Sequence, residues 1–143
     1  MPMEFYQREL RLPAYPRGFH LITSLIVDNF PEIKKLRQGM LQVFMQHTSA
    51  GLTVNENADP TVRSDFNRFS DDLVPEDYPR FIHTYEGPDD MPAHIKSSIF
   101  GCSVQLPITG GRLNLGTWQG IYLGEFRDHG GSRRLVLSAF GTT

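Results

Sequence analysis

Two histidines and three carboxylates lie in the twelve residues from His83 to His94, a segment rich in turn-forming residues. Such a segment buries little apolar surface, so its density of polar side chains requires a functional explanation. The three carboxylates are those of Glu86, Asp89 and Asp90. Imidazole and carboxylate groups together can bind a divalent cation or share a proton near neutral pH. We therefore take His83, Glu86 and His94 as candidate catalytic residues.

A second polar cluster comes earlier in the chain. His47, Thr48 and Ser49 follow a buried-type strand, and Asn55 and Glu56 follow the next apolar run. Side chains of this kind can orient a small polar substrate in a pocket. A composite active site is the leading hypothesis, with His47 as a further catalytic residue and Ser49, Asn55 and Glu56 as substrate contacts.

The histidine spacing matches no fixed zinc motif, because His83 and His94 are too far apart for one helical face. The chain also has no His-x-His pair of the kind found in cupins. A mixed histidine and carboxylate site for Mg²⁺ or Zn²⁺ stays open, with His47, His83 and His94 as candidate ligands. Metal-independent acid–base catalysis by a histidine near Glu86 is the alternative.

The segment after the carboxylates predicts a short helix with a second set of roles. Asp89 and Asp90 either cap this helix or take part in the chemistry. Free N–H groups at the helix start, with Lys96 nearby, could bind an anion such as phosphate. Arg133 and Arg134 could donate paired hydrogen bonds to the same anion, so both are candidate substrate contacts.

A tryptophan stands between glycines in the run from Gly116 to Gly120. Glycines at such positions permit the close approach of a backbone or a ligand. We expect Trp118 to be buried, with its indole N–H bonded to a partner. We expect its neighbours Thr117 and Gln119 to contact the substrate.

Composition limits the class of protein. With 143 residues, 39% of them hydrophobic, the chain is predicted to form one domain over 1–143 with a real core. The 14 basic residues do not exceed the 16 acidic ones, which argues against nucleic-acid binding. Cys102 is the one cysteine, so no internal disulfide forms, and we expect it to be buried or half-buried. The N-terminus lacks a signal-peptide pattern and no apolar run approaches roughly 20 residues, so we expect a cytoplasmic protein without membrane contact.

Hydrophobic periodicity predicts the elements that position these residues. Strands are expected at 3–12, 18–22, 40–46, 51–56, 103–107, 112–115, 118–126 and 135–140. Helices are expected from about 23 to 37 with a restart at Pro31, from Asp59 to Pro75, and before Gly101. This order indicates a β-rich α+β fold, a two-sheet antiparallel β-sandwich, jelly-roll-like, with two or three inserted helices.

The same blocks resemble the YjbQ-like family, which is named for secondary thiamine-phosphate synthase activity. They are His-Thr-Ser-Ala at 47–50, Asn-Glu-Asn-x-Asp-Pro at 55–60, His-x-x-Glu-Gly at 83–87, Ala-His-Ile-Lys at 93–96 and Leu-Gly-Thr-Trp-Gln-Gly-Ile at 115–121. They occur in the family's order over nearly the whole chain, and Gly-Thr-Trp-Gln is a specific signature.

The resemblance implies a compact β-sandwich subunit that assembles as a homotrimer. It also implies weak formation of thiamine phosphate from an aminopyrimidine methyl diphosphate and a thiazole phosphate, with loss of pyrophosphate. Residues that match the family's polar blocks are His47, Ser49, Asn55, Glu56, His83, Glu86, His94, Thr117, Gln119 and Glu125.

Three functional alternatives stay open from the sequence. Thiamine phosphate formation could be the main reaction, or a side reaction of a metal-assisted hydrolase that acts on another phosphorylated or heterocyclic substrate. The protein could also bind a metal or small molecule without turnover. The last loop, from Asp128 to Arg134, is longer than the Asp-Gly-Pro-Arg turn of many relatives, so the resemblance does not identify which arginine meets a ligand.

Overall fold

The computed structural model describes residues 2–143. Its strands are β1 Met3–Arg11, β2 Gly18–Leu21, β3 Gln38–Met45, β4 Ala50–Glu56, β5 Ser103–Thr109, β6 Arg112–Leu113, β7 Gln119–Glu125 and β8 Arg134–Thr142. Its helices are α1 Thr23–Asp28, the 3₁₀ helix η1 Pro31–Lys35, α2 Pro60–Leu73 and α3 Asp90–Phe100. All the predicted elements are therefore present, with ends that differ by a few residues.

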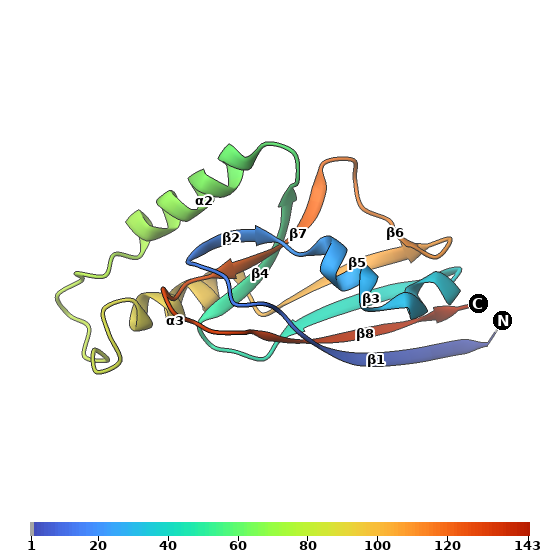
Figure 1. Ribbon diagram of the computed structural model, residues 1–143, viewed down its shortest axis with the longest axis horizontal. Coiled ribbons are helices and arrows are strands. Elements are labelled where there is room, and N and C mark those ends of the chain that lie inside the picture. Colours follow the sequence, from blue (N-terminus) through green and yellow to red (C-terminus); the bar gives the residue numbers. More distant parts are fainter. Residues whose placement is uncertain (1) are drawn as a thin grey trace.

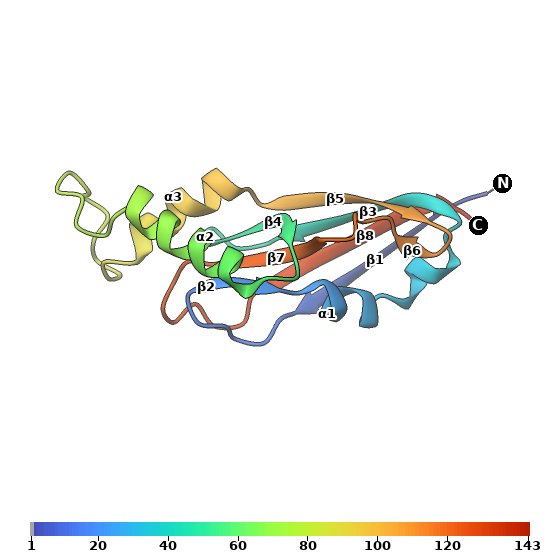
Figure 2. The same cartoon turned by 90° about the horizontal axis from the view of Figure 1, so that it is seen from above.

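The strands form two antiparallel sheets, which confirms the predicted fold class. One sheet has the order β1-β8-β3-β5-β6 and the other the order β2-β7-β4. The ribbon is elongated, with α2 and α3 at one end and both chain termini near the other (Figures 1 and 2). No helix in residues 2–143 is long and apolar enough to cross a membrane.

Alternating side chains build the main core between the sheets. In β8 the residues Leu135, Leu137 and Ala139 are fully buried, while the residues between them are partly exposed. They pack with Leu41 and Val43 of β3, the neighbouring strand. This period of two is the signal that made the strands predictable.

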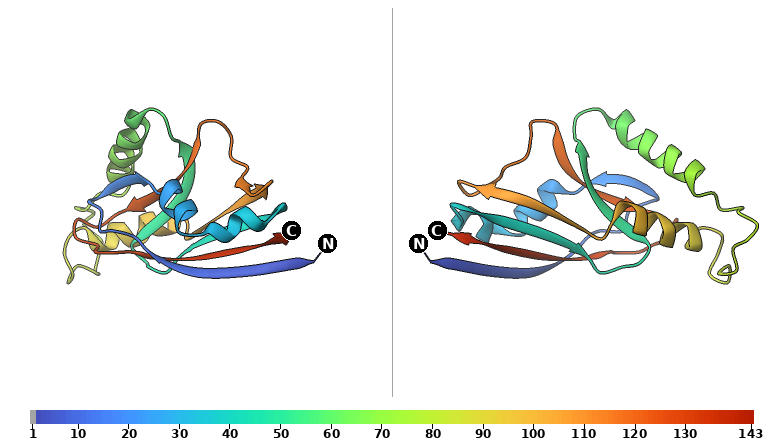
Figure 3. Two further views of the ribbon diagram at one scale, coloured as in Figure 1. Left: turned by 45° about the vertical axis from the view of Figure 1, so that its right-hand side comes forward. Right: turned by 180° about the vertical axis from the view of Figure 1, so that it is seen from behind.

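A smaller aromatic cluster fixes the end of the molecule that carries α2 and α3. Phe19, Tyr122 and Phe126 are buried there, and the rings of Phe19 and Phe100 meet with centroids 5.0 Å apart. Ser97 of α3 also donates a hydrogen bond of 2.9 Å to a backbone carbonyl at the start of β4. As a result α3 is held against β4 of the small sheet, and both views of Figure 3 show the helix beside this strand.

Helix α2 begins as predicted but buries less than predicted. The carboxylate of Asp59 accepts a hydrogen bond of 2.9 Å from Thr61 N–H, and the helix ends before Pro75. The helical spacing of Val62, Phe66, Phe69 and Leu73 predicts one apolar face, yet the exposed fractions of Phe69 and Leu73 are 68% and 56%. The expectation was wrong for these two residues because the covered face of the helix follows Phe66, which packs against the aromatic cluster, and Ser70, which is buried.

The predicted break at Pro31 is confirmed. Helix α1 ends at Asp28, and η1 restarts the chain at Pro31 as a short 3₁₀ helix. Proline has no N–H to continue the hydrogen-bond series of α1, whereas it suits the first position of a new helix.

Candidate functional site

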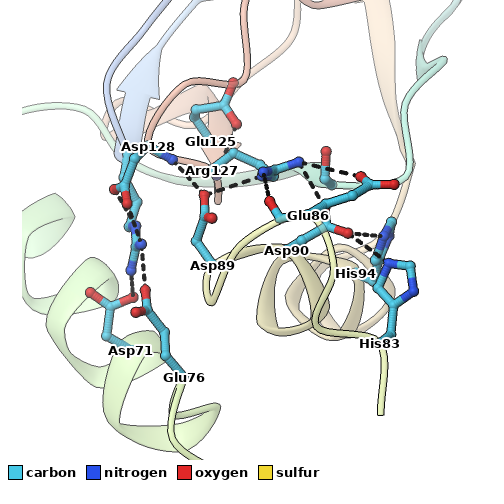
Figure 4. Close-up of polar contacts among 12 residues, drawn as sticks. Asp71, Glu76, His83, Glu86, Asp89, Asp90, His94, Glu125, Arg127 and Asp128 are labelled. Atoms are coloured by element: carbon cyan, nitrogen blue, oxygen red, sulfur yellow. Dashed lines mark hydrogen bonds and ion pairs between the residues drawn. The ribbon is translucent and has the colours of Figure 1, made fainter. Parts of the chain in front are cut away.

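A group of three ligand atoms lies at the start of α3. Asp90 and His94 are four residues apart on one face of the helix, and His83 approaches from the loop before it. The Asp90 Oδ2 atom lies 2.7 Å from His83 Nε2 and 3.2 Å from His94 Nε2 (Figure 4). One ligand atom from each residue lies within 4.8 Å of the others. The structure thus brings two of the three predicted histidines together around a carboxylate.

The carboxylate of Asp90 is buried, and its two oxygens contact different kinds of partner. Its Oδ1 atom accepts a hydrogen bond of 2.8 Å from Arg127 Nη1, while Oδ2 faces the two imidazoles. Burial alone would raise the pKa of Asp90, but the hydrogen bond with His83 and the charges of His94 and Arg127 outweigh it. The pKa of Asp90 therefore lies below its ordinary value, and the carboxylate is ionised at neutral pH.

The hydrogen bonds of His94 define where its proton sits. Its Nδ1 atom lies 2.9 Å from the backbone carbonyl of Thr48, which can only accept, so Nδ1 carries the proton. Its Nε2 atom then points at a carboxylate oxygen of Asp90. A neutral imidazole would aim a lone pair at that oxygen, which is favourable only with a cation between them. The alternative is a protonated His94 paired with the carboxylate.

The distances in this group are close to those of a shared metal site. Two ligand atoms that each lie about 2.1 Å from a metal are about 3.4 Å apart in a tetrahedral site, the usual geometry of zinc. The distances from Asp90 Oδ2 to the two histidines, 2.7 and 3.2 Å, are shorter than this, so the ligands would separate slightly to hold the ion. Two imidazole nitrogens and one carboxylate oxygen are also the ligands of many catalytic Zn²⁺ and non-haem Fe²⁺ sites, whereas Mg²⁺ prefers oxygen alone.

The surrounding charge favours a divalent cation. Arg127 contacts the carboxylates of Glu86, Asp89 and Asp90, at 4.0, 3.1 and 2.8 Å. One positive and three negative charges give a net charge of −2 when the histidines are neutral. A divalent ion would neutralise this charge.

Asp89 does not cap α3, contrary to one of the two roles we considered. It stands at the N-cap position, yet its side chain accepts no hydrogen bond from the helix. Its Oδ2 accepts instead from Arg127 Nε at 3.1 Å and from the backbone N–H of Asp128 at 3.0 Å. Burial opposes ionisation, but these hydrogen bonds hold the pKa of Asp89 below its ordinary value. Asp89 therefore ties the start of α3 to the loop after β7.

A cavity of about 420 Å³ adjoins His94. This volume is enough for a small heterocyclic ligand. Cys102 was expected to be buried or half-buried, but it is exposed and lines this space. The residues that line the cavity are His47, Thr48, His94, Ser97, Ser98, Gly101 and Cys102.

His47 reaches this cavity but not the metal-binding group. Its Nε2 atom accepts a hydrogen bond of 2.9 Å from the backbone N–H of Arg134, so its ring proton is on Nδ1. Burial, and then the charges of Arg133 and Arg134, hold the pKa of His47 below its ordinary value. A neutral His47 that offers an N–H is suited to donate to a substrate, and its Nε2 is not available to a metal.

Arg133 is a structural residue rather than the ligand contact we predicted. Its guanidinium donates two hydrogen bonds to Glu125, at 2.8 and 2.6 Å, and a third to the backbone carbonyl of Ser49 at 3.2 Å. Both charged side chains and Ser49 are buried. A Cβ atom on Gly130 would lie 2.6 Å from both members of the pair, which explains the glycine there. Arg134 is exposed, so it is the arginine that can reach a ligand.

Lys96 does not serve an anion site, contrary to expectation. Its side chain is buried and turned to α2, where Nζ lies 2.5 Å from Asp71 Oδ1. Arg17 binds the same Asp71 at 3.4 Å and also reaches Glu76 and Asp128, at 2.5 and 2.9 Å (Figure 4). These contacts join α2 to the loops around the site.

Four predicted substrate contacts, Asn55, Glu56, Thr117 and Gln119, lie at the opposite end of β4 and β7. The register pairs Glu56 with Gln119 at this end, and pairs Ala50 with Glu125 at the end near the histidines. Six residue steps of about 3.4 Å separate the two ends by about 20 Å. One chain therefore does not bring the two halves of the predicted site together.

The signature tryptophan lies at this distant end and is not buried. Trp118 has an exposed fraction of 63%, whereas we expected a buried ring with a bonded indole. Beside it, Gln119 Oε1 accepts a hydrogen bond of 2.8 Å from Gly116 N–H, which closes the turn. The polar atoms of this block thus support the turn that presents Trp118.

The sequence model of the family described as "UPF0047 protein YjbQ-like" matches residues 8–142. The UPF0047 protein YjbQ of Escherichia coli O157:H7 is 52% identical over 137 residues, which cover 96% of this chain and 99% of that protein. The UPF0047 protein YugU of Bacillus subtilis is 42% identical over 100 residues, 70% of this chain and 74% of that protein.

Two solved structures are similar over most of their length. A YjbQ/UPF0047 family protein from Clostridium acetobutylicum has a TM-score of 0.79 at 39% identity and covers 91% of this chain and 97% of its own. A conserved hypothetical protein from Thermus thermophilus has a TM-score of 0.78 at 35% identity, with 90% and 97% covered.

Proposed function

The chain belongs to the UPF0047 YjbQ-like family, and we propose that His83, Asp90 and His94 bind a divalent metal in the active site of a small-molecule enzyme. The observation that carries this proposal is the convergence of three ligand atoms within 4.8 Å, beside a cavity of about 420 Å³. Because two of the three ligands are imidazoles, we propose Zn²⁺ or a similar transition metal rather than Mg²⁺.

The reaction we propose is the formation of thiamine phosphate that the family resemblance implies. The C–O bond between the pyrimidine methylene carbon and the diphosphate breaks, and the thiazole nitrogen forms a C–N bond to that carbon. Pyrophosphate leaves with the electron pair of the broken bond. Negative charge grows on this leaving group, so the reaction needs a positive charge beside it. A bound divalent metal would supply that charge.

The residues of the chain have distinct tasks in this scheme. His94 is oriented by the carbonyl of Thr48, and Asp90 is oriented by Arg127. His47 and Ser98 both line the cavity, and the neutral ring of His47 and the hydroxyl group of Ser98 can donate hydrogen bonds. These donors can hold phosphate oxygens or the polar edge of the pyrimidine.

A metal-assisted hydrolase is the second candidate, and the ligand count supports it. Three protein ligands leave a coordination position for water, as in catalytic zinc sites. In that case a phosphorylated or heterocyclic substrate would be hydrolysed, and thiamine phosphate formation would be a side reaction.

Steady-state kinetics with metal-loaded protein tests the proposal. We expect His94→Ala to lose nearly all thiamine phosphate formation, while His129→Ala, which changes an exposed histidine outside the site, keeps it. A wild-type kcat/KM of roughly 10⁴ M⁻¹s⁻¹ or more would establish this as the main reaction. A far lower value that is still lost in His94→Ala would favour the hydrolase. Unchanged turnover in His94→Ala would refute the proposed site.

We also propose that the chain associates with two further copies of itself, as in the homotrimer that the resemblance implies. The outer face of the five-stranded sheet supports this assembly, because the helices lie over its other face or beyond its end (Figure 1). The strand registers place apolar residues of four strands side by side on this face: Phe5, Phe140, Met40 and Pro107.

The next row of side chains across the same face is uncharged, and it can form hydrogen bonds with the same row of another copy. The registers align the side chains of four strands, and one of them, Gln7, donates to Ser138 at 3.1 Å. Amides both donate and accept, so copies of this row can pair. With Phe5 exposed by 75%, the face has the character of a protein interface. The row consists of Gln7, Ser138, Gln42 and Gln105.

Light scattering after size-exclusion chromatography tests the assembly. Phe44, which is exposed, lies two residues after Gln42 in β3 and thus on the same face. We expect a trimer for the wild type and a monomer for Phe5→Glu combined with Phe44→Glu, because charges would then enter the interface. Phe69→Glu, which changes an exposed phenylalanine on α2, should leave the trimer intact. A wild-type monomer would contradict the proposal.

A further inference from the structure

We infer that Arg127 is a positioning residue of the metal centre, which fixes Asp90 so that one carboxylate oxygen faces both histidines. This inference rests on the proposed function, because it assigns a role toward a metal at His83, Asp90 and His94. It concerns a residue that no sequence motif identified. Arg127 does not contact the proposed metal and acts through Asp90.

Arg127 binds the segment that leads into α3 at three points. Its Nη1 donates to Asp90 Oδ1 at 2.8 Å, its Nε to Asp89 Oδ2 at 3.1 Å, and its Nη2 to the carbonyl of Glu86 at 3.0 Å (Figure 4). The arginine itself follows Phe126, which is buried in the aromatic cluster. A planar, rigid fork attached to the core therefore holds three nearby residues of a loop.

The contact between Arg127 and Asp90 gives the two oxygens of the Asp90 carboxylate different roles. The terminal torsion of an aspartate has a broad, roughly two-fold preference, so an unrestrained carboxylate can present either oxygen, or both, to a metal. With Oδ1 held by Arg127, only Oδ2 faces His83 and His94. The arginine thus favours a single oxygen ligand in a defined direction.

The contacts with Asp89 and Glu86 extend this role to the loop that carries His83. This loop joins α2 to α3 without a helix or strand of its own, and Ile82 and Tyr85 beside His83 are almost fully exposed. The core of the protein therefore does little to hold the loop. The bonds of Arg127 fix its last residues, and with them the approach of His83 to Asp90.

Charge and geometry make opposite predictions for a variant, which allows the role to be tested. If Arg127 acted only as a charge, its removal would change the net charge of the group from −2 to −3 and strengthen cation binding. If it positions Asp90, its removal weakens metal binding despite the more negative site. Loss of a residue that orients a metal ligand typically costs ten- to a hundred-fold in affinity.

The experiment is a Zn²⁺ competition titration of the full-length wild type, Arg127→Ala, Arg127→Lys and Arg17→Ala. Arg17 is the matched control, because it is also ion-paired to carboxylates of this region but contacts none of the three ligands. We expect about ten- to a hundred-fold weaker binding for Arg127→Ala. We expect an intermediate loss for Arg127→Lys, which keeps the charge without the fork, and no change for Arg17→Ala.

The absorption spectrum of bound Co²⁺ gives a readout of ligand geometry that general destabilisation does not imitate. We expect the visible bands of the Co²⁺ protein to shift in both Arg127 variants and to stay unchanged in Arg17→Ala. If Arg127→Ala does not fold, the Arg127→Lys variant decides by the same two measurements. Wild-type affinity and spectrum in Arg127→Lys together with equal or tighter binding in Arg127→Ala would overturn the inference. If Arg127→Ala does not fold, wild-type affinity and spectrum in Arg127→Lys alone would overturn it.

Failure of this inference is distinguishable from failure of the proposed function. A wild type that binds no Zn²⁺ contradicts the metal site itself, and the positioning role falls with it. A wild type that binds Zn²⁺, with binding lost in His94→Ala but kept in both Arg127 variants, contradicts only the role of Arg127.

Discussion

The two ends of the strand pair β4 and β7 are built from similar polar residues but differ in what holds them. At the end near Glu125, buried carboxylates are bound by arginine side chains, at distances of 2.6 to 3.1 Å. At the end near Gln119, the side chains of Gln119 and Asn55 bond to the backbone of residues close in sequence, Gly116 and Glu56, and the contacts between distant segments go to backbone atoms, as from Asn57 to the carbonyl of Gln119.

This difference separates an organised site from a polar turn. Contacts between distant segments fix a side chain against three or more elements, so its geometry survives when a ligand arrives. Local contacts shape a turn and leave its side chains exposed, as Trp118 is. We therefore place the chemistry at the Glu125 end, and we expect the Gln119 end to tolerate substitution of its side chains within one chain.

The largest effect is expected from Glu125→Ala. This change leaves the buried guanidinium of Arg133 without its carboxylate, and breaking a buried ion pair in this way costs roughly 3–5 kcal/mol. Urea denaturation should show this loss in the free energy of unfolding. Glu56→Ala is the matched change at the other end and should cost far less. Equal losses in the two variants would break the comparison.

A smaller loss of stability is expected when the protein is acidified and His47 becomes protonated. Its pKa is lowered in the folded state, so between that pKa and 6.5 the unfolded chain binds the extra proton more readily. The stability from His47 is thus present above pH 6.5 and is lost as the pH falls through the folded pKa. NMR titration should place the pKa of His47 below 6.5, and His47→Gln should flatten the loss of stability on acidification. A pKa of His47 at or above 6.5 would contradict the lowering that we attribute to burial and to the charges of Arg133 and Arg134.

The smallest effect is expected from Trp118→Ala. Because the ring is largely exposed, its removal should change the free energy of unfolding of one chain by no more than about 0.5 kcal/mol. Thermal or urea denaturation at concentrations below any self-association is the suitable measurement. A loss of several kcal/mol would mean that the ring is buried after all and would weaken the contrast between the two ends.

Much of the fold was predictable because its signals are local. The alternation in β8, the break at Pro31 and the cap at Asp59 each depend on a few adjacent residues. Errors arose where burial depends on distant segments. Leu73 has helical spacing, yet the covered face of α2 follows Phe66 and Ser70 and leaves Leu73 exposed. Trp118 is a large, mostly apolar residue of the kind that usually packs in a core, yet its turn faces the solvent.

The candidate site shows the same limit more sharply. The density of polar residues predicted a site in the segment from His83 to His94, and the structure brings those two histidines together around Asp90. The sequence did not reveal Arg127, which lies 37 residues beyond Asp90 and belongs to no motif. Nor did it reveal that Arg133 is used by Glu125 and Lys96 by Asp71. Each of these pairings is set by the packing of the sheets and α3, which spacing does not encode.

The most direct test of the metal centre is the stoichiometry of Zn²⁺ binding, measured by calorimetry on metal-free protein. Wild type should bind one ion per chain, and His83→Ala combined with His94→Ala should bind none while keeping the wild-type circular dichroism spectrum. His47→Ala should still bind one ion, because His47 lies outside the ligand group. One ion per chain in the double variant, or none in the wild type, would contradict a metal site at His83, Asp90 and His94.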